Sequence, residues 1–139
     1  MIFWDTSALA PLLVVEGESG RCSRLAREEP GMTVWWGTSV ECRSALARRV
    51  REGMSAGDAA RTRDVLAALS RSWAEILPSD EVREHAGRLL DRHPLRAADA
   101  LQLGAAMTWA DARPRGHRFA TLDARLAEAA VREGFALAL

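Results

Sequence analysis

Residues 1–10, MIFWDTSALA, place four apolar side chains in front of an acid, Asp5. The apolar run is too short for a helix and is followed by polar residues, so it predicts a buried strand over Ile2–Trp4. The next stretch, Ser7–Val15, has the apolar spacing of a helix. A carboxylate is therefore expected where a buried strand ends, and its presence there needs a chemical reason.

Short apolar strands and helices alternate along the rest of the chain. Further strands are expected over Thr33–Trp36, Ala74–Leu77, His117–Ala120 and Phe135–Leu139, and helices over Glu18–Glu29, Ser39–Glu52, Ser55–Ser72, Asp80–Arg92, Arg96–Ala112 and Ala124–Glu133. In the helix over Ser39–Glu52 the apolar residues Val40, Ala45, Leu46 and Val50 are expected to face inward. This alternation predicts an α/β fold of one domain over residues 1–139, with a parallel sheet of four to five short strands and helices on both faces.

Composition excludes several classes of mechanism. All 19 basic residues are arginine, so no mechanism that needs a lysine, such as a P-loop or a Schiff base, is available. The formal net charge of zero argues against a generally basic nucleic-acid binder. Cys22 and Cys42 have no metal-like spacing with each other or with a histidine, which predicts partly buried, reduced thiols and no zinc site.

The chain also has no sign of membrane insertion or export. No apolar run approaches the roughly twenty residues of a membrane span. A signal peptide needs a longer apolar core than the one that ends at Asp5. We therefore expect a cytoplasmic protein without a membrane partner.

Four acids are expected near the starts of helices that follow strands. Asp5 follows the first strand, and Glu41 lies in the first turn of the helix after the second. Asp123 follows the fourth strand directly, and Asp99 lies in the first turn of its own helix. Because ligands of open parallel sheets bind at the carboxyl ends of the strands, these carboxylates are expected at one rim of the molecule.

Helix capping is the competing interpretation of each acid. Thr38 and Glu41 fit a capping box, and Asp123 is a good N-cap residue. Asp5 fits the cap of the first helix, and Asp99 fits a favourable interaction with a helix dipole. Capping explains Asp99 least well, because its helix is apolar and an unpaired carboxylate there is costly.

Four converging carboxylates without a lysine would repel one another, and a divalent cation would remove that repulsion. Hard oxygen ligands select Mg²⁺ or Mn²⁺. Asp5 and Asp99 are the expected metal ligands, with Glu41 and Asp123 as further candidates. Such a site suits hydrolysis of a phosphodiester bond by an activated water, with no protein nucleophile.

Four motifs in order, MIFWDTSAL, VECRSALARR, LRAADALQL and FATLDARLAEAAVREG, resemble the acidic motifs of PIN-domain ribonucleases, and most closely those of VapC toxins. The resemblance runs essentially from end to end. It implies a PIN-like three-layer sandwich and a Mg²⁺- or Mn²⁺-dependent endoribonuclease that cleaves structured RNA, often a transfer or ribosomal RNA loop. It also implies a homodimer and a cognate antitoxin that covers the active groove.

The resemblance assigns roles to particular residues as well. Asp5, Glu41, Asp99 and Asp123 occupy the family's acidic, catalytic positions. Ser7 and Thr121 occupy supporting hydroxyl positions, where they order the acids or a metal-bound water. One departure is the bulky sequence over residues 35–37, Trp-Trp-Gly, which precedes the glutamate helix.

Two further surfaces are candidates for binding. Arg43 and Arg96 are candidates for binding RNA phosphates, although helix spacing allows either to face away from the acids. The apolar side chains of the first helix are expected to form a groove for an antitoxin helix. These side chains are Leu9, Leu12, Leu13 and Val14.

Three alternative functions remain open from the residues. A housekeeping PIN nuclease would share the acids but have no antitoxin. A receiver-like signalling module would bind Mg²⁺ around a phosphorylated aspartate, but it would need a lysine that this chain lacks. A helical interaction protein would use all four acids as caps and bind no metal.

Overall fold

The computed structural model describes residues 1–139 and has five strands and seven helices. The strands are β1 (Ile2–Trp4), β2 (Met32–Trp35), β3 (Ala74–Ile76), β4 (Arg118–Ala120) and β5 (Ala136–Leu137). The helices are α1 (Thr6–Leu13), α2 (Ser19–Glu28), α3 (Thr38–Arg51), α4 (Ala56–Ser70), α5 (Asp80–Arg92), α6 (Ala97–Trp109) and α7 (Ala124–Glu133). No helix combines the length and apolar character needed to cross a membrane.

All five strands are parallel and lie in the order β3-β2-β1-β4-β5. From β1 the chain builds outward to β2 and β3, and then returns to place β4 on the other side of β1. The carboxyl ends of β1 and β4 therefore flank the point where the winding direction reverses. In open α/β sheets this switch point is where ligands bind.

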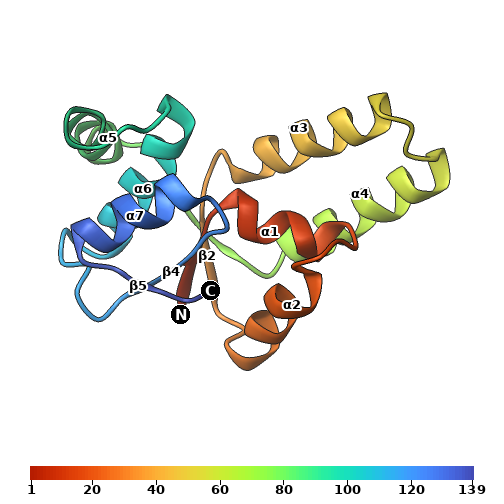
Figure 1. The fold of residues 1–139 in the computed structure, drawn as a ribbon, viewed down its shortest axis with the longest axis horizontal. Helices are drawn as coiled ribbons and strands as arrows, with labels where there is room; N and C mark the ends of the chain where they lie inside the picture. The colour runs from red at the N-terminus through yellow and green to blue at the C-terminus, as the bar shows by residue number, and fades with distance from the viewer.

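Helices cover both faces of the sheet, and the alternation of side chains along β1 shows how. Ile2 and Trp4 are fully buried against α1 to α4, whereas Phe3 is fully buried against the group formed by α5, α6 and α7. Figure 1 shows these two groups of helices on opposite sides of the strands. The predicted three-layer α/β sandwich is confirmed.

The helix that carries Asp99 is held close to its neighbour. A Cβ atom at Gly104 of α6 would lie 3.0 Å from the carbonyl oxygen of Val82 and from the backbone nitrogen of Ala86, both in α5. Only glycine permits this backbone approach, because a side chain would push the two helices apart. The contact thereby fixes the position of α6 against α5.

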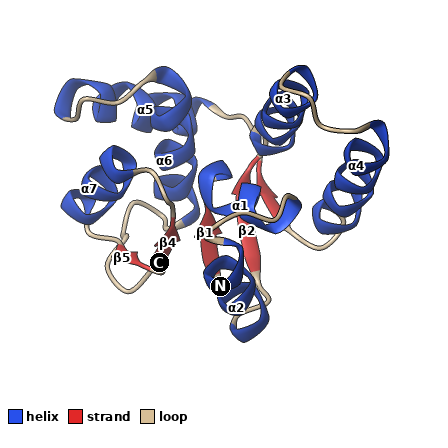
Figure 2. Cartoon of the chain, turned by 45° about the vertical axis from the view of Figure 1, so that its right-hand side comes forward, coloured by secondary structure: helices blue, strands red, loops and turns tan.

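The expected inner face of α3 is partly wrong. Val40 and Val50 are 65% and 40% exposed, and the buried residues of the helix are Thr38, Cys42 and Leu46. Leu46 is buried as expected, but apolarity misplaced the two valines because Thr38 and Cys42 make up the rest of the inward stripe. Figure 2 shows the hairpin of α3 and α4 reaching away from the strands, which leaves the outer side of α3 in solvent.

Candidate active site

Asp5 lies at the carboxyl end of β1, beside the end of β4. Its backbone N–H donates to the carbonyl oxygen of Ala120 over 2.9 Å, and its side chain is 4% exposed. The Oδ2 atom accepts from the Ser7 backbone N–H (3.2 Å), the Ser7 hydroxyl (2.5 Å) and the Thr121 hydroxyl (2.9 Å). Asp5 therefore caps α1, while its Oδ1 atom has no protein donor.

The Ser7 and Thr121 hydroxyls bind more than Asp5. The Ser7 hydroxyl oxygen accepts from the backbone N–H of Leu122 (2.9 Å), and the Thr121 hydroxyl oxygen accepts from that of Asp123 (3.1 Å). Each hydroxyl thus donates to the Asp5 carboxylate, which follows β1, and accepts from the chain after β4. Together they hold Asp5 in one orientation and join the two strand ends of the switch point.

Glu41 does not cap its helix, so the expected capping box over Thr38 and Glu41 is wrong. Gly37 is the N-cap residue of α3, and no side chain caps this end. The Oε2 atom of Glu41 accepts instead from the Thr6 hydroxyl (2.9 Å) and the Gln102 amide (3.3 Å). Its carboxylate is therefore held by side chains of α1 and α6, and its Oε1 atom has no protein donor.

Gln102 is the centre of this second network and was missed from the sequence. It is fully buried, and its amide nitrogen also donates to the hydroxyls of Thr6 (2.9 Å) and Thr38 (3.2 Å). Its Oε1 atom has no partner. A buried amide at the junction of three helices sets where Glu41 points.

Asp99 and Asp123 lie on the other side of the site. Asp123 is the N-cap residue of α7, and its Oδ1 atom accepts from the Leu126 backbone N–H over 2.8 Å, as predicted. Asp99, in the first turn of α6, lines an open pocket of about 570 Å³ together with Asp123. We call Asp5 and Glu41 the hydroxyl-side pair, and Asp99 and Asp123 the arginine-side pair after the arginines described below.

The four acids form an electrostatically coupled row. Burial raises the pKa of Asp5 from 3.8 to about 6, hydrogen bonds from Ser7 and Thr121 partly oppose the rise, and the charge of Glu41 adds to it. Burial and, more weakly, the charge of Asp99 raise the pKa of Glu41. Burial and the charge of Asp123 raise the pKa of Asp99. In the row Asp5, Glu41, Asp99, Asp123, the charge of each acid therefore raises the pKa of the acid before it.

The cysteines take no part in this chemistry. Both are free, as expected, and both are fully buried rather than partly buried. Burial, together with the charges of Glu41 and Asp5, raises the pKa of Cys42 to about 12, so its thiol stays protonated near neutral pH. Cys42 shows that the negative potential of the acids extends beneath the site, but it cannot act as a nucleophile.

Comparison with known proteins places this chain in a family. No protein-family model matches the chain. Ribonuclease VapC45 of Mycobacterium tuberculosis (strain CDC 1551 / Oshkosh) is 32% identical over 123 residues, which cover 80% of this chain and 78% of the relative. Ribonuclease VapC49 of M. tuberculosis (strain ATCC 25618 / H37Rv) matches with the same identity and coverage. The chain belongs to the VapC ribonuclease family.

Solved structures share the fold of this VapC-family chain at lower sequence identity. The VapC20 toxin of M. tuberculosis, described as cleaving the sarcin–ricin loop, superposes with a TM-score of 0.70 at 21% identity over 93% of this chain and 95% of its own. PAE2754 of Pyrobaculum aerophilum superposes with a TM-score of 0.63 at 21% identity over 95% and 88%. Both likenesses support the PIN-like sandwich.

The carboxylates of this VapC-family site fit a hydrated magnesium ion better than a closed cage of protein ligands. No three His, Cys, Asp or Glu side chains are close enough to hold one ion together, so the expected convergence of all four acids on one point is not seen. Asp5, Glu41 and Asp123 each use one oxygen for a protein hydrogen bond and keep the other without a donor. Magnesium is commonly bound by one or two carboxylates, several waters and substrate phosphates.

The two candidate arginines lie in different places. Arg96 lines the pocket of Asp99 and lowers the pKa of that carboxyl group. Arg43 lines a separate groove between α3 and α4, together with Arg63, and is not brought to the acids. Arg125, in the first turn of α7, lines the same pocket as Arg96 and was missed from the sequence.

Proposed function

We propose that this VapC-family chain is a Mg²⁺- or Mn²⁺-dependent endoribonuclease toxin that acts in the cytoplasm. It hydrolyses phosphodiester bonds in structured RNA, such as a transfer or ribosomal RNA. The observation that carries the proposal is the row of four coupled carboxylates at the switch point, three of which keep one oxygen free of protein donors. Such a row is unfavourable by itself and becomes favourable around a divalent cation.

Each residue has a definite task in this proposal. Asp5 and Asp99 hold the metal, and Glu41 and Asp123 are further ligands to it or to its waters. The metal, when bound, supplies charge neutralisation and activation of water. Ser7 and Thr121 fix the orientation of Asp5 through their hydrogen bonds to its Oδ2 atom.

Protonation states support this assignment. With a pKa of about 6, Asp5 is mostly ionised near pH 7 even without a bound cation. A cation favours the ionised form further, so metal affinity is expected to fall as the pH drops below 6. A site of this kind binds metal best at neutral or slightly alkaline pH.

The class of RNA is proposed from the relatives. VapC20 is described as a toxin that cleaves the sarcin–ricin loop, and it shares this fold. A looped RNA exposes single-stranded backbone, which an open pocket beside the acids can receive. We therefore propose a loop of a structured RNA as the substrate of this chain.

Cleavage assays test the catalytic part. Folded protein is mixed with total bacterial RNA in Mg²⁺, in Mn²⁺ and in EDTA, and fragments are mapped at their new ends. Cleavage is expected in either metal, with 5′-phosphate and 3′-hydroxyl ends, and none in EDTA or in Asp5→Asn. Asp91→Asn, an exposed acid of α5, is the matched control and should cleave normally. Cleavage that persists in EDTA and in Asp5→Asn would rule the proposal out.

Neutralisation by an antitoxin is supported by a groove on the first helices. Leu13 and Val14 line a groove of about 140 Å³ together with Cys42, Ala45 and Leu46. Of the other two predicted side chains, Leu9 is fully buried, and neither Leu9 nor Leu12 lines the groove. An apolar helix from an antitoxin would cover these side chains at i, i+3 and i+4 spacing.

A growth assay separates a toxin from a housekeeping nuclease. Expression of the chain alone should arrest cells, and co-expression with the protein of the neighbouring gene should restore growth. The purified pair should also melt at a higher temperature than the chain alone. Normal growth on expression of an active enzyme would favour the housekeeping function. The proposed homodimer is tested by light scattering of the free chain.

A further inference from the structure

The pocket beside Asp99 has a mixture of charges that the metal site alone does not require. Its charged lining residues are Asp99, Asp123, Arg96 and Arg125. Its volume of about 570 Å³ is roughly three times that of six waters at about 30 Å³ each. The pocket therefore has room for a larger group beside a hydrated ion.

Arg96 and Arg125 are not committed to structural ion pairs. The chain has nine salt bridges, and neither arginine takes part in one. Both are exposed, and both line the pocket of Asp99. A divalent cation on the carboxylates would leave these two positive charges uncompensated, and they would then attract an anion.

The opposite side of the site has no such charges. The groups that contact Asp5 and Glu41 are the hydroxyls of Thr6, Ser7 and Thr121, the amide of Gln102 and one backbone N–H. No arginine donates a hydrogen bond to Asp5 or Glu41, whereas Arg96 and Arg125 both line the pocket of the arginine-side pair. An RNA strand that reaches the acids would therefore meet these arginines beside Asp99 and Asp123.

We propose that Arg125, together with Arg96, binds the RNA phosphate next to the scissile one, in the pocket beside Asp99 and Asp123. This inference rests on the proposed function and adds the residues that position its substrate. The planar guanidinium group of arginine matches two phosphate oxygens at once, which lysine cannot do. Arg96 and Arg125 lie at the starts of α6 and α7. Binding to both would fix the direction in which the RNA strand runs away from the four acids.

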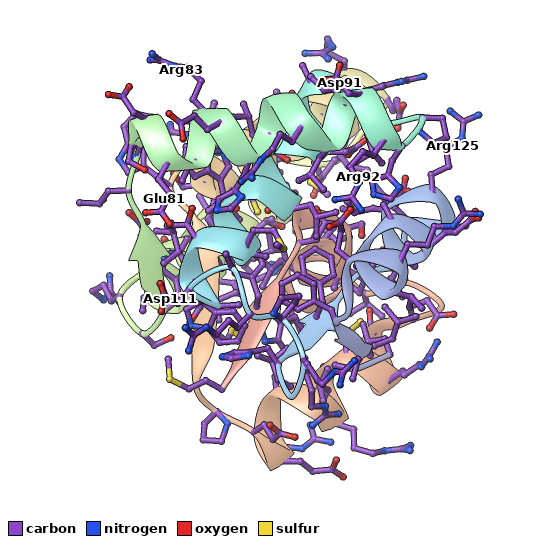
Figure 3. The ribbon with its side chains drawn as sticks, turned by 90° about the vertical axis from the view of Figure 1, so that its left-hand side faces the viewer. Glu81, Arg83, Asp91, Arg92, Asp111 and Arg125 are labelled. Carbon is purple, nitrogen blue, oxygen red and sulfur yellow. The ribbon has the colours of Figure 1, made fainter.

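The surroundings of Arg125 leave its side chain accessible to an RNA strand. Figure 3 shows its side chain extending outward from α7, beside the end of α5, with Arg83 near the opposite end of α5. Pro94, which follows α5, also lines the pocket. Arg83 is exposed and paired with Asp80 at 3.3 Å, so it is a matched control arginine outside the site.

Binding without cleavage tests the inference. All variants are made in the Asp5→Asn background. The probe is a fluorescein-labelled 20-nucleotide stem-loop RNA. Fluorescence anisotropy measures its Kd in Mg²⁺ at KCl concentrations from 0.05 to 0.3 M. Loss of one phosphate contact to a single strand should lower the slope of log Kd against log salt by about 0.7, or about fivefold in Kd at 0.1 M. Arg125→Ala and Arg96→Ala should each show this change.

Two further variants distinguish loss of the bidentate phosphate contact from loss of positive charge, and from a general effect of removing an arginine. Arg125→Lys keeps the charge, so the salt slope should be retained while Kd rises. Arg83→Ala should leave both Kd and slope unchanged. Circular dichroism checks that each variant is folded.

The inference fails if Arg125→Ala and Arg96→Ala bind as the parent does, if Arg83→Ala has an equal effect, or if the parent does not bind the RNA saturably. These results do not depend on cleavage. A protein that binds as expected but cleaves in no metal would overturn the proposed nuclease and leave the arginine site standing.

Discussion

The two pairs of acids in this site are the same kind of residue at similar places in the fold, yet their surroundings differ. Asp5 is 4% exposed and is bound by hydroxyls, and Glu41 is bound by a hydroxyl and a buried amide. Asp99 and Asp123 line an open pocket between arginines. We propose that the hydroxyl-side pair keeps charge in a fixed position, whereas the arginine-side pair meets the charged substrate.

The largest expected effect comes from removing one charge from each pair. Glu41→Gln and Asp99→Asn should each reduce RNA cleavage by about a hundredfold to a thousandfold, since each removes a carboxylate from the row that we propose holds the metal. Initial rates at saturating Mg²⁺ measure the loss, and Asp91→Asn is the neutral control. A loss in only one of the two variants would show that the pairs do not form one site.

The second effect concerns stability against pH, and it is expected for Asp5. Its folded-state pKa of about 6 lies above its ordinary value of 3.8, so between these values the folded state binds more protons than the unfolded state. Ionisation of Asp5 therefore lowers the free energy of unfolding. This loss begins near pH 4 and is complete above about pH 6. At about 1.4 kcal/mol per pH unit, the cost above pH 6 is roughly 3 kcal/mol.

Asp5→Asn should remove this cost while abolishing cleavage. In EDTA, urea denaturation should show the variant gaining on the wild type by roughly 3 kcal/mol between pH 4 and pH 6.5, and by no more at higher pH. Mg²⁺ should reduce the difference by stabilising the wild type alone. A difference that stays constant with pH would mean that the ionised carboxylate is not disfavoured by burial.

The third effect tests how Glu41 is held. Gln102→Leu keeps the volume of a fully buried side chain but removes the amide that donates to Glu41. Groups that orient metal ligands typically contribute tenfold to a hundredfold, so kcat should fall by about that factor. RNA affinity should not change, because Gln102 does not line the arginine pocket.

A half-buried polar residue elsewhere in the same helix provides the control for Gln102. Thr108 also lies in α6, and its hydroxyl has no hydrogen-bond partner. Thr108→Val should therefore leave kcat unchanged. If Gln102→Leu weakens RNA binding and leaves kcat intact, Gln102 does not act through Glu41.

Local signals in the sequence were sufficient for much of the fold. The bounds of α5 and α7 were predicted as observed, because Ser79 and Asp123 cap their first turns, and Pro94 and the left-handed Gly134 (φ 112°) follow their ends. The order of the strands was not predictable, since short strands carry no signal for which neighbour they pair with.

The residues of the candidate site were also only partly predictable from the sequence. Acids at helix starts could be found because their type and position are unusual together. Gln102, Thr6 and Arg125 could not, because an amide, a hydroxyl or an arginine on a helix has many ordinary roles. Arg43 follows Glu41 by two residues, a turn of about 200° around the helix, so it points away from the acids once Glu41 faces them.

The smallest effect concerns Asp123, which caps a helix just as Asp5 does but in an open setting. Asn is about as good an N-cap as Asp, so Asp123→Asn should change the free energy of unfolding by less than about 0.5 kcal/mol. Asp123→Ala removes the acceptor for the Leu126 N–H and should cost about 1 kcal/mol. Urea denaturation at pH 7 in EDTA measures both.

This pair of variants decides whether the contrast between Asp5 and Asp123 is real. If charge removal stabilises the protein at position 5 but not at position 123, then burial, and not capping, makes the Asp5 carboxylate costly. Equal stabilisation by Asp5→Asn and Asp123→Asn would show that repulsion along the whole row dominates. The two pairs of acids would then differ in their surroundings but not in their energetics.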